Sequence, residues 1–239
     1  MLQHVWERAS LARYLSGTII ATDDPRVYEV ARSFGAQARM TRSDHPSGTD
    51  RVAEVASAER ASIVVNIQGD EPLIDPSAID LAILPLLHDS GVAMSTLKKR
   101  IEDPREIADP NVVKVVTNRR GDAIYFSRSP IPFEREAGGR AACFKHIGLY
   151  VYRRDFLLKY SALPAGPLEI SERLEQLRAL ENGYSIRVVE TDYDSVGVDT
   201  PQDLERVSRM FENRRPQAGE AAESMPEQDW PRMNADERR

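Results

Sequence analysis

The chain has 239 residues, of which 41% are hydrophobic, and a formal net charge of -6. This length predicts one large domain or two small ones, with enough apolar residues for a sizeable core. The negative charge argues against nucleic acid or an anionic membrane surface as a partner, because neither is attracted electrostatically. The single cysteine, Cys143, excludes an intrachain disulfide. The sequence shows no signal peptide and no uninterrupted apolar stretch of membrane-spanning length, which predicts a cytoplasmic protein.

The first hundred residues alternate between strand-like and helix-like patterns. Helical spacing of apolar residues is found at 2–15, 25–34, 49–59 and 75–91, and short β-branched or apolar runs at 17–22, 35–41 and 62–68. Pro25 stands at a helix start, and Pro85 predicts a kink near the end of the fourth helix. Because strand–helix–strand crossovers are right-handed and place helices on both faces, this order predicts an α/β fold with a doubly wound, mostly parallel sheet.

The pattern changes in the second half of the chain. Two alternating runs at 111–118 and 122–128 flank a short turn and predict an antiparallel hairpin, and 144–154 predicts a third strand of a smaller antiparallel region. Further on, we expect one helix at 170–183, a strand at 185–191 and a closing helix at 200–213 that Thr200 caps. The domain is therefore expected to span 1–212, and the polar, proline-containing stretch 213–239 to be disordered.

An acidic loop follows a short buried strand in the sequence VVNIQGDEPLIDP, residues 64–76. In open α/β sheets ligands bind at the carboxyl ends of strands, so Asp70 lies where a functional carboxylate is expected. Asp199 also follows a short apolar run and precedes a helix. Two carboxylates of this kind suit Mg²⁺, which also takes waters and substrate phosphate oxygens. The alternative is that both loops are ordinary turns with solvated acids.

Three other segments carry candidate binding groups. Ser47-Gly48-Thr49 precedes a helix and offers hydroxyls and free backbone N–H groups, although it could be only a cap. In KHIGLYVYRR, His146 and Tyr150 share one side of a strand and Gly148 leaves room between them; a solvated strand face would look the same. Arg128 could grip an acidic substrate, because guanidinium pairs with carboxylate in bidentate fashion.

Seven stretches, in this order and at this spacing, resemble the 3-deoxy-manno-octulosonate cytidylyltransferase family, also called CMP-Kdo synthetases. They are TRSDHPSGTDRVAEV, VVNIQGDEPLI, DPNVVKVVTN, YFSRSPIPF, KHIGLYVYR, LEQLRAL and VGVDTPQDLERV. The resemblance covers about residues 1–212. It implies a nucleotidyltransferase that joins CTP to 3-deoxy-D-manno-octulosonate (Kdo), giving CMP-Kdo and pyrophosphate for lipopolysaccharide synthesis. It also implies Mg²⁺ as cofactor and a homodimer as the assembly.

The same resemblance assigns expected roles to individual residues. Asp70 and Asp199 match the family's catalytic metal ligands. The nucleotide is expected at Ser47, Gly48, Thr49 and Arg51. The expected sugar-acid contacts are Gln68, Arg128, His146, Tyr150, Glu175 and Gln176.

One departure from the family pattern separates two functional hypotheses. Family members begin with a strand and a basic loop, IPARxxSxRxPGK, that wraps the triphosphate; here Met1 falls in the helix that follows that loop. Since everything downstream matches an intact site, we expect a start assigned too late rather than a truncated gene. The rival hypotheses are a non-catalytic nucleotide- or sugar-acid-binding protein and a transferase of the same fold that uses another sugar acid.

Overall fold

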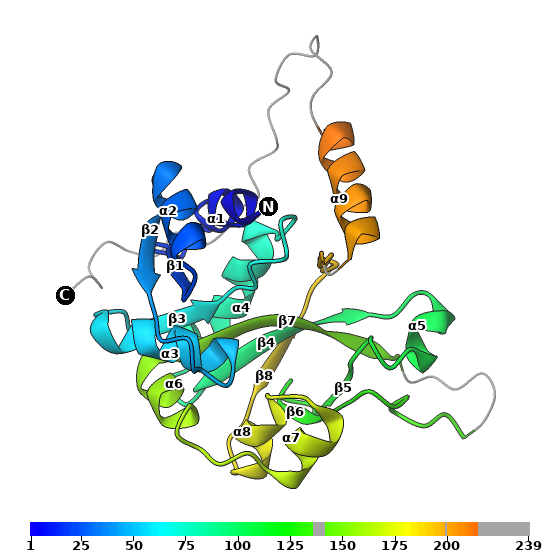
Figure 1. Cartoon of the computed structure of the whole chain (residues 1–239). Coiled ribbons are helices and arrows are strands. Elements are labelled where there is room, and N and C mark those ends of the chain that lie inside the picture. The colour runs from blue at the N-terminus through cyan, green and yellow to red at the C-terminus, as the bar shows by residue number, and fades with distance from the viewer. Residues whose placement is uncertain (136–141, 199, 215–239) are drawn as a thin grey trace, which may run out of the picture.

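The structure is a computed structural model that describes residues 1–135, 142–198 and 200–214 (Figure 1). Its helices are α1 (Leu2–Ala9), α2 (Pro25–Ser33), α3 (Gly48–Ala58), α4 (Pro76–His88), α5 (Pro104–Ala108), α6 (Arg154–Tyr160), α7 (Pro167–Glu172), α8 (Leu177–Glu181) and α9 (Pro201–Arg214). Its strands are β1 (Ile19–Thr22), β2 (Gln37–Met40), β3 (Ile63–Asn66), β4 (Met94–Arg100), β5 (Lys114–Thr117), β6 (Ala123–Ser127), β7 (Phe144–Arg153) and β8 (Arg187–Glu190). The predicted α/β class is confirmed.

Three helices begin at an Asp-Pro pair, and the local chemistry explains why. Asp24, Asp75 and Asp103 cap α2, α4 and α5, each accepting a hydrogen bond from the backbone N–H two residues on. Proline follows each cap at the first helical position, where its fixed φ is favourable and its missing N–H costs nothing.

The main sheet is mixed and is organised around the long strand β7. Six strands take part: the path is β6-β5-β7-β4-β8, and β3 also pairs with β7. β7 is antiparallel to β3, β4 and β5, whereas β4 and β8 are parallel. Thus β3, β4, β5 and β8 all run in one direction, and the predicted mostly parallel sheet holds in this sense. β1 and β2 form a separate parallel pair, and β5 and β6 form the predicted hairpin.

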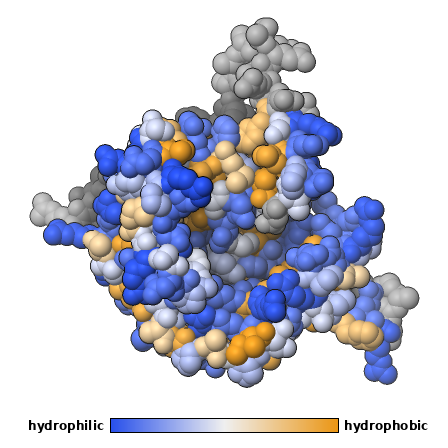
Figure 2. Space-filling model, in the orientation of Figure 1, coloured by the Kyte–Doolittle hydropathy of each residue, from blue (hydrophilic) through white to orange (hydrophobic). Residues whose placement is uncertain are grey.

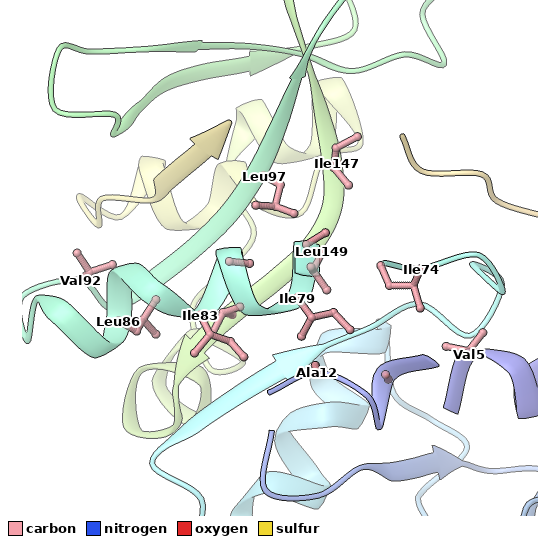
Figure 3. Close-up of a cluster of buried hydrophobic side chains, with 14 residues drawn as sticks. Val5, Ala12, Ile74, Ile79, Ile83, Leu86, Val92, Leu97, Ile147 and Leu149 are labelled. Atoms are coloured by element: carbon pink, nitrogen blue, oxygen red, sulfur yellow. The ribbon is translucent and has the colours of Figure 1, made fainter. Parts of the chain in front are cut away.

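One of two large apolar layers lies between α4 and the strands β4 and β7 (Figure 3). Ile79, Ile83 and Leu86 of α4 are buried against Leu97 and Ile147. Burial of each such side chain contributes about 1.5–3 kcal/mol, so this layer fixes β7 firmly. A rigid β7 gives the side chains on its other face a stable position.

Several predicted elements differ from those observed. The helix expected at 170–183 is interrupted between α7 and α8, where Arg173 takes a left-handed conformation with φ of 53°. α4 contains Pro85, as predicted, and ends at His88, three residues before the predicted end; α9 extends to Arg214, two residues beyond the predicted domain end. The remaining residues of the predicted disordered tail, 215–239, lie outside the described part of the chain.

Within the described ranges, no helix combines the length and apolar character needed to cross a membrane.

Candidate active site

The acidic loop after β3 carries Asp70 at the edge of the sheet, as predicted. The Asp70 side chain is half-buried, and no hydrogen bond or ion pair joins its carboxylate to another described residue. Its backbone carbonyl accepts a hydrogen bond from the N–H of Val198 at 3.0 Å. This bond places the segment that precedes α9 directly against the Asp70 loop. Asp199, the second predicted metal ligand, lies outside the described residues.

Whether this loop suits Mg²⁺ depends on the donors available. Among the described residues, no three His, Cys, Asp or Glu side chains gather into a group able to hold a metal. Mg²⁺ does not need such a cage, because it commonly binds through one or two carboxylates, waters and substrate phosphates. A carboxylate with no partner among the described residues therefore fits this ion.

The start of α3 contacts Glu175, which connects the predicted nucleotide residues with the predicted sugar residues. The Thr49 hydroxyl donates a hydrogen bond to the Glu175 carboxylate at 3.2 Å. The Ser47 hydroxyl has one proton for two carboxylates, Asp50 at 2.7 Å and Glu175 at 3.2 Å. Ser47 also caps α3 by accepting from the N–H of Asp50. Burial raises the pKa of Glu175, and the hydrogen bonds from Thr49 and Ser47 oppose that rise.

A line of contacts leads from Thr49 to the sheet. Asn66, at the end of β3, donates to the Thr49 hydroxyl at 3.4 Å. Asn66 is also the cross-strand partner of Tyr150 on β7. The α3 start, the end of β3 and β7 are therefore three neighbouring sides of one site.

The β7 side presents a neutral imidazole and a phenol. The His146 ring hydrogen-bonds Thr96 at 2.9 Å, meets Phe126 edge-on and lies 5.3 Å from the Tyr150 ring. Desolvation lowers the pKa of His146 to about 3, so this imidazole is uncharged at neutral pH. A Cβ atom placed on Gly148 would meet no described atom within 4 Å. Open space thus lies beside Gly148, whereas the rings of His146 and Tyr150 themselves approach each other closely.

Arg128, at the end of β6, is held by α7 and the loop before β5. Its Nε donates to the Glu172 carbonyl at 2.8 Å, and its Nη1 donates to the Pro110 carbonyl at 2.9 Å. Nη2 donates to the Arg173 carbonyl at 3.4 Å. The Glu172 carboxylate in turn accepts from the Arg128 N–H at 2.9 Å and from the Ser127 hydroxyl at 2.6 Å. These bonds give a physical reason for the helix break at Arg173.

The other predicted residues differ in their exposure to solvent. Gln68 and Gly48 are exposed, and Gln176 is buried two residues after Leu174. Arg51 forms an ion pair with Asp23 at 3.2 Å. Figure 2 shows a largely hydrophilic face that is hollowed near its centre.

Two hollows of the surface are lined by residues outside this candidate site. One of 790 Å³ lies between α1, α4 and the segment after β8, and one of 290 Å³ lies between α1 and α9. Neither is lined by the residues predicted to bind nucleotide or sugar.

Three side chains in or beside the candidate site were not singled out from the sequence. Thr96 hydrogen-bonds His146 and lies on β4. This strand ends in Lys-Lys-Arg, so its sequence does not indicate that its first four residues are buried. Asn66 interrupts an otherwise apolar strand, which is a usable signal for a polar contact at the sheet edge. Lys114 resembles an ordinary surface lysine in sequence, yet it is fully buried.

Comparison with known proteins places this site in a family. Residues 1–187 match the family described as Cytidylyltransferase. A 3-deoxy-manno-octulosonate cytidylyltransferase of Solibacter usitatus is 76% identical over 211 residues, covering 88% of this chain and 84% of the relative. This chain belongs to the 3-deoxy-manno-octulosonate cytidylyltransferase family. The assignment makes the protein an enzyme of the nucleotidyltransferase class.

Other relatives agree with this family. A 3-deoxy-manno-octulosonate cytidylyltransferase of Geobacter metallireducens is 55% identical over 217 residues, covering 87% of this chain and 85% of its own. The solved structure of a CMP:2-keto-3-deoxy-manno-octonic acid synthetase complexed with CTP superposes with a TM-score of 0.85 at 45% identity, covering 89% and 87% of the two chains. A 4-diphosphocytidyl-2C-methyl-D-erythritol synthase of Anaerococcus prevotii, 12% identical with a TM-score of 0.59, shares the fold alone.

Proposed function

We propose that this protein transfers CMP from CTP to Kdo. The observation that carries the proposal is the contact of the Ser47 and Thr49 hydroxyls with the Glu175 carboxylate, which joins the expected nucleotide side of the site to the expected sugar side. Names and bound CTP among the relatives support the choice of substrates. The cytoplasmic location remains a prediction from the sequence.

In the proposed reaction the anomeric hydroxyl of Kdo attacks the α-phosphorus of CTP. A new oxygen–phosphorus bond forms, the bond to the β-phosphate oxygen breaks, and pyrophosphate leaves; the hydroxyl proton passes to solvent. Holding both substrates in one orientation supplies much of the rate enhancement. The protein's main task is therefore to bind and align two ligands.

Distinct groups of side chains suit the two ligands. Ser47, Gly48, Thr49 and Arg51 would hold the nucleotide. His146 and Tyr150, both uncharged, suit the sugar hydroxyls, and Arg128 suits the carboxylate; Gln68, Glu175 and Gln176 would complete the sugar side. Asp70 and Asp199 would hold Mg²⁺, which when bound offsets the charge of the triphosphate.

We extend the proposal to a homodimer. Ile124 and Phe133 are 60% and 86% exposed, and a partner subunit that covers them would remove this apolar surface from water. Light scattering on the eluate of a sizing column tests this; a monomer at micromolar concentration would reject the dimer without affecting the proposed reaction.

Pyrophosphate release by the product of the full open reading frame tests the reaction. We expect release that requires Mg²⁺, CTP and Kdo together, and a large loss when UTP replaces CTP or when Kdo is omitted. Mass spectrometry of the product should show CMP-Kdo.

Other outcomes support the rival functions. A protein that is stabilised against heat by Kdo or CTP but releases no pyrophosphate would be a binding protein. Release with a different sugar acid and not with Kdo would indicate another transferase of this fold.

A further inference from the structure

A buried lysine beside the proposed sugar-acid site has no role in the reaction described above. Lys114 lies at the start of β5, its side chain has no exposed surface, and its cross-strand partner is Ser127, the residue before Arg128. Burying a charge is costly unless its hydrogen-bonding groups are satisfied, so such a lysine needs a specific reason.

The ammonium of Lys114 has three donors, and three backbone carbonyls accept from it. Its Nζ donates to the carbonyls of Asp109 at 2.8 Å, Val112 at 2.6 Å and Arg128 at 2.5 Å. Two of these carbonyls belong to the loop 109–112, and the same loop supplies the Pro110 carbonyl that binds the Arg128 guanidinium. Lys114 and Arg128 therefore hold one loop together.

Arg128 is held at both of its backbone polar atoms. Lys114 binds its carbonyl, and the carboxylate of Glu172 accepts from its N–H at 2.9 Å. Burial would raise the pKa of Glu172, but hydrogen bonds from Ser127 and the N–H of Arg128 lower it overall, which keeps this carboxylate ionised. One cation and one anion thus fix the backbone of this residue.

The guanidinium of Arg128 retains capacity for a ligand. It has five N–H donors, of which three bind the carbonyls of Glu172, Pro110 and Arg173. The two that remain, one on Nη1 and one on Nη2, are equal in number to the oxygens of a carboxylate. Arg128 is also close to the sugar side, because Phe126, two residues earlier on β6, packs against His146.

We propose that Lys114 and Glu172 are positioning residues for Arg128, fixing its backbone from opposite sides so that its two remaining donors receive the carboxylate of the sugar acid. This inference rests on the proposed function and adds two residues that do not themselves touch the substrate. It predicts that Lys114 and Glu172 affect the binding of the sugar acid but not of CTP, and that they do so only through Arg128.

Steady-state kinetics of Lys114→Met and Glu172→Gln tests the proposal. Each change should raise KM for Kdo, by about 10-fold for Lys114→Met and less for Glu172→Gln, while KM for CTP stays within about 2-fold. If Lys114→Met does not fold, Glu172→Gln tests the same claim from the other side. The rise in melting temperature that Kdo alone produces should shrink in parallel, which gives a readout independent of turnover.

A double-mutant cycle separates positioning from a general loss of stability. In an Arg128→Ala background, Lys114→Met should change KM for Kdo by less than about 2-fold further, because the group it positions is absent. The matched control is Arg153→Met: Arg153 also donates to three carbonyls, those of Leu86, Asp89 and Val92, but at the opposite end of β7. It should lower the melting temperature and leave KM for Kdo unchanged.

The outcomes distinguish this inference from the proposed function. A parental KM and a parental Kdo-induced stabilisation in both single variants would overturn the positioning role alone. Full, multiplicative effects in the Arg128→Ala background would also overturn it. A parent protein that neither turns over Kdo nor is stabilised by it would overturn the proposed function, and the positioning role with it.

Discussion

The loop after β3 and the strand β7 form two sides of one candidate site, but they hold their functional groups in opposite ways. On the loop, Gln68 is exposed and the Asp70 carboxylate has no partner among the described residues. On β7, His146 is fixed by Thr96 and by packing against Phe126. A side chain without hydrogen-bond partners is available to a ligand but contributes little to stability. A side chain that already has partners contributes to ligand binding and to stability. Substitutions on the two sides should therefore separate activity from stability.

The largest effect is expected on the loop. Asp70→Ala should lower kcat by at least about 100-fold, a magnitude typical of removing a preorganised electrostatic group, and shift the melting temperature by no more than about 2 °C. The matched control is Asp75→Ala, five residues on, which removes the cap of α4. That change should cost about 1 kcal/mol of stability and preserve turnover. More than a tenth of parental kcat in Asp70→Ala would remove Asp70 from the catalytic site.

A second prediction concerns the space on β7 rather than a contact. Gly148→Ala adds a methyl group where no described atom lies within 4 Å, so it should not lower stability. Relief of glycine's backbone entropy in a strand could raise the unfolding free energy by about 0.5–1 kcal/mol. If the sugar acid occupies this space, KM for Kdo should rise several-fold. Gly17→Ala, at an exposed position that is equally open, should leave KM unchanged. An unchanged KM in Gly148→Ala would place the ligand elsewhere.

Parts of this site follow from local sequence, and parts do not. The Asp70 loop, the cap at Ser47 and the β5–β6 hairpin each depend on residues close together in the chain, so the sequence predicts them. The helix break at Arg173 depends on Arg128, and the burial of Lys114 depends on carbonyls from 109–112 and 128. Such convergence of distant segments leaves no periodic signal in the sequence.

The burial of His146 on β7 should also make the stability of the protein depend on pH. Because His146 has its pKa lowered from 6.5 to about 3 in the folded protein, the unfolded chain binds a proton that the folded protein does not. Stability is therefore lost as pH falls below 6.5, by up to about 1.4 kcal/mol per pH unit from this group. Urea unfolding between pH 7.5 and 5 should show this slope, and His146→Gln should reduce it. Equal slopes in both proteins would contradict a desolvated imidazole.

The smallest effect is expected for Ser47, whose hydroxyl has hydrogen-bond partners and is also accessible to a ligand. Its hydroxyl caps α3 through the N–H of Asp50 and contacts the carboxylates of Asp50 and Glu175. The residue is nevertheless only half-buried and lies where the nucleotide is expected. Ser47→Ala should therefore lower the unfolding free energy by about 1 kcal/mol and raise KM for CTP without changing KM for Kdo. Ser57→Ala, near the end of the same helix and exposed, tests whether any hydroxyl of α3 would do, and should alter neither quantity. A loss of stability without a change in KM for CTP would make Ser47 a cap alone and would move the nucleotide away from the start of α3.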